Sequence, residues 1–279
     1  MGTWLVTGAS SGIGRKVAEQ LLKRGDKVAA VARRRDRLND LAEQYGDQIW
    51  TAQLDVTDTE ALRAVIDRVF AELGQVDVVF SNAGSGAVGA AEELEDSMIE
   101  QQIALNLVAP IQLARAVFPR LRAQGGGRFI QTSTMGGQIT SPGAGMYHAS
   151  KWGVEGFLES VAPEVAPFGI GITLVEPGVV RTDFGAALSI APPIPAYAST
   201  PVGQMRQYIE ASGGNLTGDA SGDPEKVAAA VIDSVNINPA PLRLALGSDS
   251  YGAIQAALQR RLAQLESTKS ISFSTDYDQ

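Results

Sequence analysis

Short apolar runs alternate along most of the chain with longer segments in which apolar residues recur every three or four positions. The runs are apolar throughout rather than alternating, which is typical of parallel strands covered by helices on both faces. Strands are predicted over residues 4–7, 27–32, 49–54, 76–81, 127–132, 170–176 and 242–246. Helices are predicted over residues 12–24, 36–45, 59–73, 97–123, 146–168, 224–236 and 249–266.

Repeated strand–helix units of this kind predict an α/β fold, a single Rossmann-type doubly wound parallel sheet flanked by helices on both faces. Residues 184–222 break the rhythm and are rich in Pro, Ala, Ser and Gly. A connection of that length is typical of a binding loop or lid. We therefore expect a single Rossmann-fold domain over residues 1–266, with a lid inserted at 184–222. The polar tail over 267–279 is expected to be frayed.

Composition narrows the class of protein. The 279 residues carry a net charge of −8, which argues against a protein that reads a nucleic-acid backbone. No apolar run approaches the roughly 20 residues of a membrane span, and the N-terminus enters a strand too soon for a signal peptide. Cysteine is absent and histidine occurs once, at His148, so no metal site is predicted. These features indicate a cytoplasmic enzyme or binding domain.

A glycine-rich turn, TGASSGIG, joins the first strand to the first helix. Its glycines allow a pyrophosphate to approach the backbone, while the helix N-terminus offers free N–H groups and a partial positive charge. The spacing differs from the general G-x-G-x-x-G fingerprint, and tight turns also need glycine for steric reasons. In its strand–helix context the turn predicts a nucleotide site, formed by Gly8, Ser10, Ser11, Gly12, Ile13 and Gly14.

Three consecutive arginines, Arg33, Arg34 and Arg35, follow the second strand. An NAD site usually has an acid here that binds the ribose 2′-hydroxyl, but the first acid is Asp36. A guanidinium suits a 2′-phosphate because it forms paired charge-assisted hydrogen bonds. A solvated helix start is the alternative, although the helix dipole disfavours arginine in a first turn. Arg33 and Arg34 are therefore predicted to select NADP(H).

Two further strand ends are expected to face the same crevice, because ligands bind at the carboxyl ends of parallel strands. Asp55 and Val56 follow the third strand, where the carboxylate can accept from an adenine amino group. Asn82, Ala83 and Gly84 follow the fourth strand, where small residues let a ribose lie against the backbone. Each group alone is also ordinary turn chemistry.

Tyr147 and Lys151 are four residues apart in a helical segment, so their side chains share a face. A free phenol ionises near pH 10, and a neighbouring ammonium is expected to lower that pKa toward working pH. Such a pair can act as a general acid and base. Tyr/Lys pairs with this spacing also arise by chance, so the pair indicates a catalytic function only in combination with the other motifs.

Taken together, these motifs resemble the short-chain dehydrogenase/reductase family, in its compact branch, over about residues 3–183. The resemblance is carried by the T-G-x-x-x-G-x-G turn, N-A-G, Asn106 in the long helix, the hydroxyl-rich strand end TSTMGG, Y-x-x-x-K, and Pro177-Gly178 followed by Thr182. The later part of the chain is similar to the hydroxysteroid- and retinol-dehydrogenase-like subgroup.

The resemblance implies roles for individual residues. Tyr147 exchanges the proton of the substrate oxygen, Lys151 holds the nicotinamide ribose and lowers the tyrosine pKa, and Asn106 anchors a water that links Lys151 to solvent. The cofactor carboxamide is expected near Pro177, Gly178, Val180 and Thr182. Family members are often homodimers or homotetramers through the helices predicted at 97–123 and 146–168.

The substrate-orienting hydroxyl departs from the family pattern. In the family a serine commonly lies 13 residues before the tyrosine, and here that position holds Thr134, whereas Ser133 lies 14 before it. A threonine hydroxyl donates and accepts as serine does, but its methyl group restricts the rotamer and narrows the pocket. Thr134 is therefore the expected substrate contact, with Ser133 or a turn-capping role for Thr134 as alternatives. His148 is expected to be structural.

These observations predict an NADP(H)-dependent oxidoreductase that moves a hydride between nicotinamide and a carbonyl or alcohol. The apolar lid residues indicate a hydrophobic substrate, although they suit a dimer surface or loop packing equally well. A sugar-nucleotide epimerase or dehydratase is one alternative, disfavoured by the glycine spacing. A non-catalytic NADP(H)-binding sensor is another, disfavoured by Tyr147, Lys151 and Asn106 together.

Overall fold

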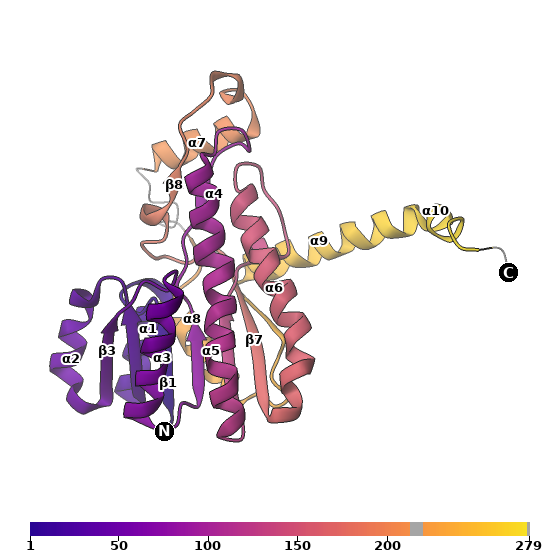
Figure 1. The fold of residues 1–279 in the computed structure, drawn as a ribbon. Helices are drawn as coiled ribbons and strands as arrows, with labels where there is room; N and C mark the ends of the chain where they lie inside the picture. The colour runs from indigo at the N-terminus through magenta and orange to yellow at the C-terminus, as the bar shows by residue number, and fades with distance from the viewer. Residues whose placement is uncertain (213–219, 278–279) are drawn as a thin grey trace.

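The computed structural model describes residues 1–212 and 220–277 and is built on a seven-stranded sheet in which every neighbouring pair of strands is parallel (Figure 1). The strand order is β3-β2-β1-β4-β6-β7-β9. Chain order reverses direction between β1 and β4, and such a switch point opens a ligand crevice at the carboxyl ends of the strands. The strands are β1 Thr3–Thr7, β2 Lys27–Ala32, β3 Ile49–Gln53, β4 Val78–Ser81, β6 Gly127–Thr132, β7 Ile170–Pro177 and β9 Arg243–Leu246.

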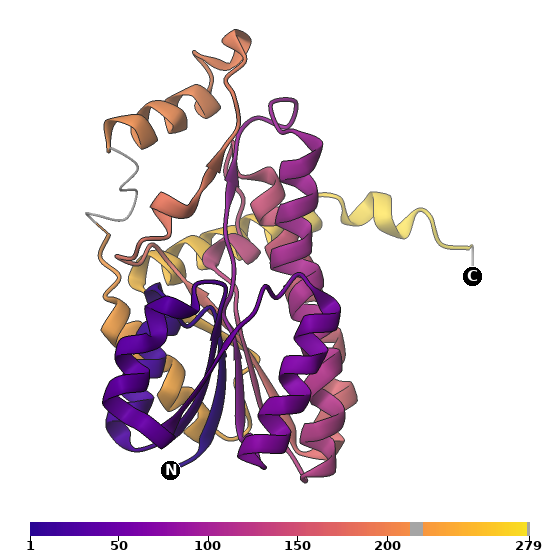
Figure 2. The ribbon, with the colours of Figure 1, turned by 60° about the vertical axis from the view of Figure 1, so that its left-hand side comes forward.

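Helices cover both faces of the sheet, as the apolar strand runs predict (Figures 1 and 2). In β1, Leu5 packs with α3, α5 and α6, whereas Trp4 and Val6 pack on the opposite face with α1, α2 and α8. All three side chains are almost fully buried, which is why the run is apolar without alternation. The helices are α1 Gly12–Arg24, α2 Asn39–Tyr45, α3 Thr59–Leu73, α4 Asp96–Ile103, α5 Ala109–Ala123, α6 Gly145–Val165 and α8 Pro224–Asp233. The predicted doubly wound α/β class is confirmed.

The predicted helix over 97–123 contains an irregular turn. Helices α4 and α5 are joined by a π-helical turn over 104–108, and Asn106 is the buried residue of that turn. A π turn inserts an extra residue into the helical repeat and often marks a functional site. The repeat of apolar positions continues on both sides, so the sequence pattern alone does not reveal it.

The predicted lid, 184–222, contains more regular structure than its composition suggests. Strand β8 (Ser189–Ile190) pairs with β5 (Ala87–Val88), and Pro201–Ala211 forms helix α7. Both lie beyond the carboxyl ends of the large sheet (Figure 1). Pro201 begins α7, and proline at the first helical position is favourable because its missing N–H has no partner there. Residues 213–219 of the predicted lid lie outside the described residues.

One buried carboxylate joins the lid to the loop after β5. Glu93 accepts hydrogen bonds from the backbone N–H groups of Ala90, at 2.7 Å, and Ile194, at 2.9 Å. It also forms a 2.8 Å ion pair with Arg206 on α7. These partners hold the pKa of Glu93 below its ordinary value although burial acts in the opposite direction.

The tail that is expected to be frayed is partly helical in the described residues. Helix α9 (Ser248–Ser267) is followed by a short helix, α10 (Lys269–Phe273), and together they project from the body as an arm (Figures 1 and 2). Residues 278–279 of the predicted tail lie outside the described residues. Within residues 1–212 and 220–277, no helix combines the length and apolarity of a membrane span, and no cluster of side chains is suited to a metal ion.

Candidate active site

Helix α6 carries Tyr147 and Lys151 to the carboxyl end of β6. The Lys151 ammonium is almost fully buried and donates a 2.9 Å hydrogen bond to the carbonyl oxygen of Thr132, the last residue of β6. Its nitrogen lies 6.0 Å from the centre of the Tyr147 ring. Burial lowers the pKa of Lys151 to about 8, and the charge of Glu155, one helical turn further on, opposes that shift. The amine is therefore poised to change charge in mildly alkaline solution.

Tyr147 differs from the expectation drawn from the sequence. Burial raises the pKa of Tyr147 to about 12, and a hydrogen bond with the Thr134 side chain only partly offsets this shift. The pKa of Tyr147 is thus shifted opposite to the expected lowering by Lys151, because burial disfavours the charged phenolate. A phenol in this environment stays protonated at neutral pH, which suits a proton donor.

The three hydroxyls of TSTMGG have three different partners. The Thr132 hydroxyl donates to the side-chain oxygen of Asn82 at 3.1 Å. Ser133 is buried and donates to the carboxylate of Glu155. The Thr134 hydroxyl accepts from the Gly136 N–H at 3.3 Å, so it caps its own turn as the alternative predicts, and it donates to the Pro177 carbonyl oxygen at 3.4 Å. It also forms a hydrogen bond that lowers the pKa of Tyr147. Of these hydroxyls, it is that of Thr134 that lies beside the phenol.

Asn106 belongs to the π turn between α4 and α5 and lies next to the Lys151 side chain of α6. Its amide nitrogen donates to the Ser85 carbonyl oxygen at 2.8 Å, and its amide oxygen accepts from the Ser85 N–H at 3.1 Å. A methyl group added at Gly84 would lie 3.2 Å from the Asn106 oxygen and 3.8 Å from the Lys151 nitrogen. The structure therefore brings Gly84, Asn106 and Lys151 together, as the motifs predict.

The glycine-rich turn has the shape of an anion cradle. Gly8 and Gly12 have φ angles of +65° and +55°, which favour glycine, and a side chain at Gly14 would collide with Asn82 and the Gly8 carbonyl. The Ser11 hydroxyl makes no capping bond at the start of α1, and no acidic residue lies in the first turn. An uncapped helix N-terminus with close backbone access fits the pyrophosphate of a dinucleotide.

The three consecutive arginines separate in space. Arg34 reaches the Ser11 hydroxyl of the glycine-rich turn at 3.4 Å, and the charge of Arg33 helps to lower the pKa of Asp55. Arg35 turns away and donates to Thr51 on β3 at 3.3 Å. Arg33 and Arg34 are thus the two guanidiniums that flank the predicted cofactor end of the crevice. Asp55 itself accepts from the N–H and hydroxyl of Thr57.

The segment after β7 closes the crevice from the other side. A methyl group at Gly12 would lie 3.6 Å from the Thr182 side chain, so this segment reaches the glycine-rich turn. Gly178 packs so closely against the Asp249 carboxylate that a side chain there would collide with it. Val180 forms a bridge to Gly222, which ties this segment to the end of the predicted lid.

Other side chains at the site carry no sequence motif. Phe184 tilts against Tyr147 with ring centres 6.1 Å apart, and Glu155 accepts from Ser133. The four-residue spacing from Lys151 to Glu155 was a usable signal, because i,i+4 side chains share a helix face. His148 lies close by but is occupied by the loop after β6: its ring nitrogens contact the Gly136 carbonyl oxygen at 2.8 Å and the Ser141 N–H at 2.9 Å.

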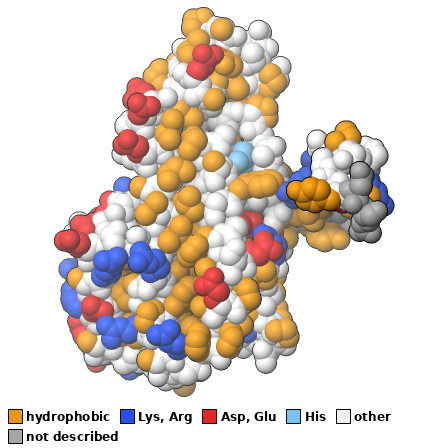
Figure 3. Space-filling view, turned by 45° about the vertical axis from the view of Figure 1, so that its right-hand side comes forward, with side chains coloured by type: hydrophobic (Ala, Val, Ile, Leu, Met, Phe, Trp, Pro, Cys, Tyr) orange, Lys and Arg blue, Asp and Glu red, His pale blue; other side chains and the backbone are white. Residues whose placement is uncertain are grey.

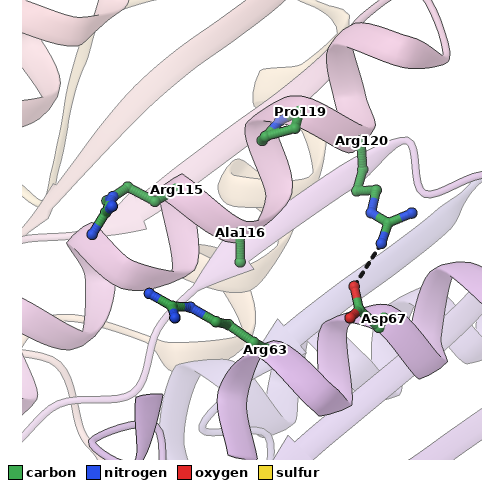
Figure 4. A pocket seen from close by; sticks show the side chains of 6 residues that line it. All are labelled: Arg63, Asp67, Arg115, Ala116, Pro119 and Arg120. Atoms are coloured by element: carbon green, nitrogen blue, oxygen red, sulfur yellow. Dashed lines mark hydrogen bonds and ion pairs between the residues drawn. The ribbon is translucent and has the colours of Figure 1, made fainter. Parts of the chain in front are cut away.

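A hollow of about 380 Å³ lies between α3 and α5, away from these groups (Figure 4). Its rim holds three arginines, and Arg120 forms a 2.6 Å ion pair with Asp67. None of the candidate site residues lines it, and its charged side chains are exposed. The lining residues are Arg63, Asp67, Arg115, Ala116, Pro119 and Arg120.

Comparison with known proteins agrees with this geometry. Residues 3–191 match the family model for short chain dehydrogenases. The chain is 34% identical to the oxidoreductase BOA17 of Botryotinia fuckeliana over 248 residues, covering 88% of this chain and 89% of that protein. The crystal structure of a short-chain dehydrogenase from Streptomyces avermitilis superposes with a TM-score of 0.91 at 40% identity, covering 99% of this chain and 100% of that one.

A second solved structure was determined with a nucleotide. The alcohol dehydrogenase of Thermococcus sibiricus, complexed with 5-hydroxy-NADP, superposes with a TM-score of 0.72 at 26% identity and covers 88% of this chain and 96% of that one. The family model spans well over half of the present chain, and the full-length match to the Streptomyces avermitilis structure extends beyond it. The chain belongs to the short-chain dehydrogenase family of oxidoreductases.

Proposed function

We propose that the chain is an NADP(H)-dependent oxidoreductase that interconverts a carbonyl group and an alcohol. The observation that carries the proposal is the placement of Tyr147, Thr134, Lys151 and Asn106 around one point at the carboxyl end of β6. A site that only binds nucleotide has no need of a half-buried phenol beside a buried amine. The nicotinamide cofactor, held by the glycine-rich turn and the segment after β7, would supply or accept the hydride.

The side chains of the site supply the remaining steps. In reduction, the Tyr147 hydroxyl donates its proton to the carbonyl oxygen as the C–H bond forms at the carbonyl carbon. The Thr134 hydroxyl, already bonded to Tyr147, also holds that oxygen and stabilises its developing charge. Lys151 stabilises the phenolate that remains. Asn106, held by the Ser85 backbone beside Lys151, would anchor a water through which the proton is replaced from solvent, as the family resemblance implies.

The proposed substrate is hydrophobic, and 184–222 is its lid. Apolar side chains of the lid lie against the two loops beside Tyr147. A methyl group at Gly143 would lie 3.1 Å from the sulfur of Met205, and Leu188 packs closely against Gly86. Phe184 contacts the ring of Tyr147 itself. These contacts favour a pocket whose walls are apolar and whose polar groups are confined to Tyr147 and Thr134.

The preference for NADP(H) rests on Arg33 and Arg34. Replacing either by Ala removes a charge-assisted bond to a 2′-phosphate, so the KM for NADPH is expected to rise about 10- to 100-fold. The KM for NADH should change little. The measurement is the rate of cofactor oxidation with a panel of apolar ketones and aldehydes. Arg35→Ala is the matched control, because Arg35 bonds Thr51 instead.

Two outcomes of that assay would reject parts of the proposal. Equal use of both cofactors by the wild type, unchanged in the Arg33 and Arg34 variants, would reject the cofactor preference. Tight NADPH binding without NADPH oxidation by any carbonyl would favour the non-catalytic sensor. Conversion of a sugar nucleotide without net use of the cofactor would favour the epimerase or dehydratase.

Thr134 and Ser133 are expected to differ sharply. Thr134→Ala removes the hydroxyl bonded to Tyr147 and should lower kcat about 100-fold, the usual cost of one donor at a developing oxyanion. Thr134→Ser should retain most activity. Ser133→Ala should have little effect on kcat, because Ser133 faces Glu155. Steady-state kinetics of the three variants test this, and the reverse ranking would assign the substrate contact to Ser133.

The pH dependence of carbonyl reduction should reflect the protonation state of Lys151. Because the pKa of Lys151 is about 8 and that of Tyr147 about 12, raising the pH removes the lysine charge first. The kcat/KM for reduction, which reflects the free enzyme, should be highest below pH 8 and fall as pH rises through it. Arginine stays charged in this range, so Lys151→Arg should flatten that fall even if its overall rate is lower. If kcat/KM fell identically at alkaline pH in the wild type and in Lys151→Arg, the fall would not be due to Lys151.

We further propose that a second copy of the chain covers the C-terminal arm. Hydrophobic side chains are visible on the surface of the projecting arm (Figure 3). Leu258, Leu262 and Leu265 are 51–63% exposed at helical spacing along one side of α9, and the exposed Ile271 and Phe273 follow on α10. With Tyr251 these are six large side chains. At roughly 100 Å² each, two arms would bury on the order of 1,200 Å², the lower bound for specific interfaces. Two-fold symmetry covers both arms at once.

Light scattering after size exclusion tests this assignment. The wild type is expected to be a dimer or a larger even oligomer, and Leu262→Glu should shift it toward the monomer. Gln264→Glu adds the same charge on another side of α9 and should leave the assembly unchanged. An oligomer that persists in the Leu262 variant would place the interface elsewhere, for example on the helices near residues 97–123 and 146–168.

A further inference from the structure

A buried charge cluster lies behind the Tyr147–Thr134 face of the site. Glu155 is on α6, one turn after Lys151, and Glu176 is near the end of β7. Both carboxylates are about 2% exposed. Arg243, at the start of β9, reaches both of them. Two carboxyl groups with so little water around them need specific partners.

The partners of Glu155 come from two parts of the chain, the segment after β6 and strand β9. Arg243 forms an ion pair with it, the Gln138 amide donates at 3.0 Å, and the Ser133 hydroxyl donates to its other oxygen. Gly137 has no room for a side chain because the Glu155 carboxylate occupies that space. The carboxylate is therefore held rigidly behind the strand end that carries Thr134.

The cluster holds more carboxyl groups than guanidinium groups. Arg243 also pairs with Glu176, at 2.8 Å, and with the half-exposed Glu159, at 2.7 Å. Three carboxylates thus share one guanidinium. Within the described residues, Arg261 reaches the oxygen of Gln138 rather than these carboxylates. The remaining cation on this face of α6 is Lys151, one turn before Glu155, where i,i+4 side chains are neighbours.

We propose that Glu155 is a positioning residue that keeps the buried Lys151 amine in its charged form and turns Ser133 away from the substrate. The inference rests on the proposed oxidoreductase function, because Lys151 stabilises the phenolate only while it is charged. It also explains why the hydroxyl at 133 is unavailable and the one at 134 carries the substrate contact.

The electrostatics of the two groups act in the required direction. Burial lowers the pKa of Lys151 and Glu155 raises it, so the carboxylate offsets part of the burial penalty. Burial, helped by Glu176, raises the pKa of Glu155 above its ordinary value, and the hydrogen bond from Ser133 and the charge of Arg243 offset only part of that rise. Besides these groups, the ionisable side chains facing the cluster are Glu159 and His148 on α6 and Arg261 on α9. The effect should appear on the alkaline side, where Lys151 loses its proton.

Lysine NMR tests the proposal without turnover. The chain has six lysines, so ¹³Cε-labelled lysine gives few signals, and the one lost in Lys151→Met is that of Lys151. In the cofactor-free full chain, Glu155→Gln should lower the pKa of Lys151 by about one unit or more, because an opposite charge is lost. Glu159→Gln is the matched control: it removes a carboxylate from the same Arg243, two turns from Lys151, and should shift the value little. Equal shifts in both variants, or none in Glu155→Gln, would overturn the proposal.

Two further measurements cover other outcomes. Glu155→Asp keeps the charge and should retain a pKa for Lys151 close to that of the wild type. If Glu155→Gln does not fold, the reciprocal titration decides: the pKa of the Glu155 carboxyl, followed through its ¹³Cδ signal, should rise in Lys151→Met. No rise there would reject the coupling.

Kinetics separate this inference from the proposed function. In Glu155→Gln the alkaline fall of kcat/KM for carbonyl reduction should move to lower pH by the same amount as the NMR value, with no such movement in Glu159→Gln. A wild type that reduces carbonyls but shows no movement would reject the role of Glu155 alone. A wild type that reduces no carbonyl would reject the function, while the NMR titration would still test the coupling.

Discussion

The hydrogen bond from the buried Lys151 ammonium to the Thr132 carbonyl oxygen joins α6 to the end of β6, and the rest of the site depends on it. An amine with so little solvent is held charged only if other groups replace the water it has lost. The carbonyl of a strand end supplies one such group, and the carboxylate of Glu155 supplies the opposite charge. The same arrangement fixes Tyr147, one turn earlier on α6, beside Thr134.

Strand geometry explains how one short segment serves three purposes. Successive side chains of an extended chain point to opposite sides, and the backbone remains extended through Thr134. Thr132 and Thr134 therefore share a side, toward Asn82 and Tyr147, while Ser133 points to Glu155. A shift of one residue would exchange these roles. That is why counting back from Tyr147 distinguishes two adjacent hydroxyls that composition cannot separate.

Much of the fold and part of the site could be predicted, because their signals are local in sequence. Apolar runs mark the strands, and the glycine-rich turn marks its own geometry. Other features depend on residues far apart along the chain, such as the pairing of Glu155 with Arg243, 88 residues later, or of β5 with β8. The raised pKa of Tyr147 belongs to this second group, because burial is a property of the assembled fold and not of the Y-x-x-x-K spacing.

The lid and the catalytic face divide polar and apolar contacts between them. The polar contacts are made by Glu93, which accepts hydrogen bonds from two backbone N–H groups and forms an ion pair with Arg206. These charged groups are therefore paired at a distance from Tyr147. Because the charges are paired there, the side chains nearest the phenol can be apolar, such as Phe184. An apolar wall over the site raises the cost of a phenolate and keeps Tyr147 protonated. Burial also makes the charge on Lys151 harder to maintain, and in the proposed arrangement the Glu155 carboxylate behind the site offsets part of that penalty.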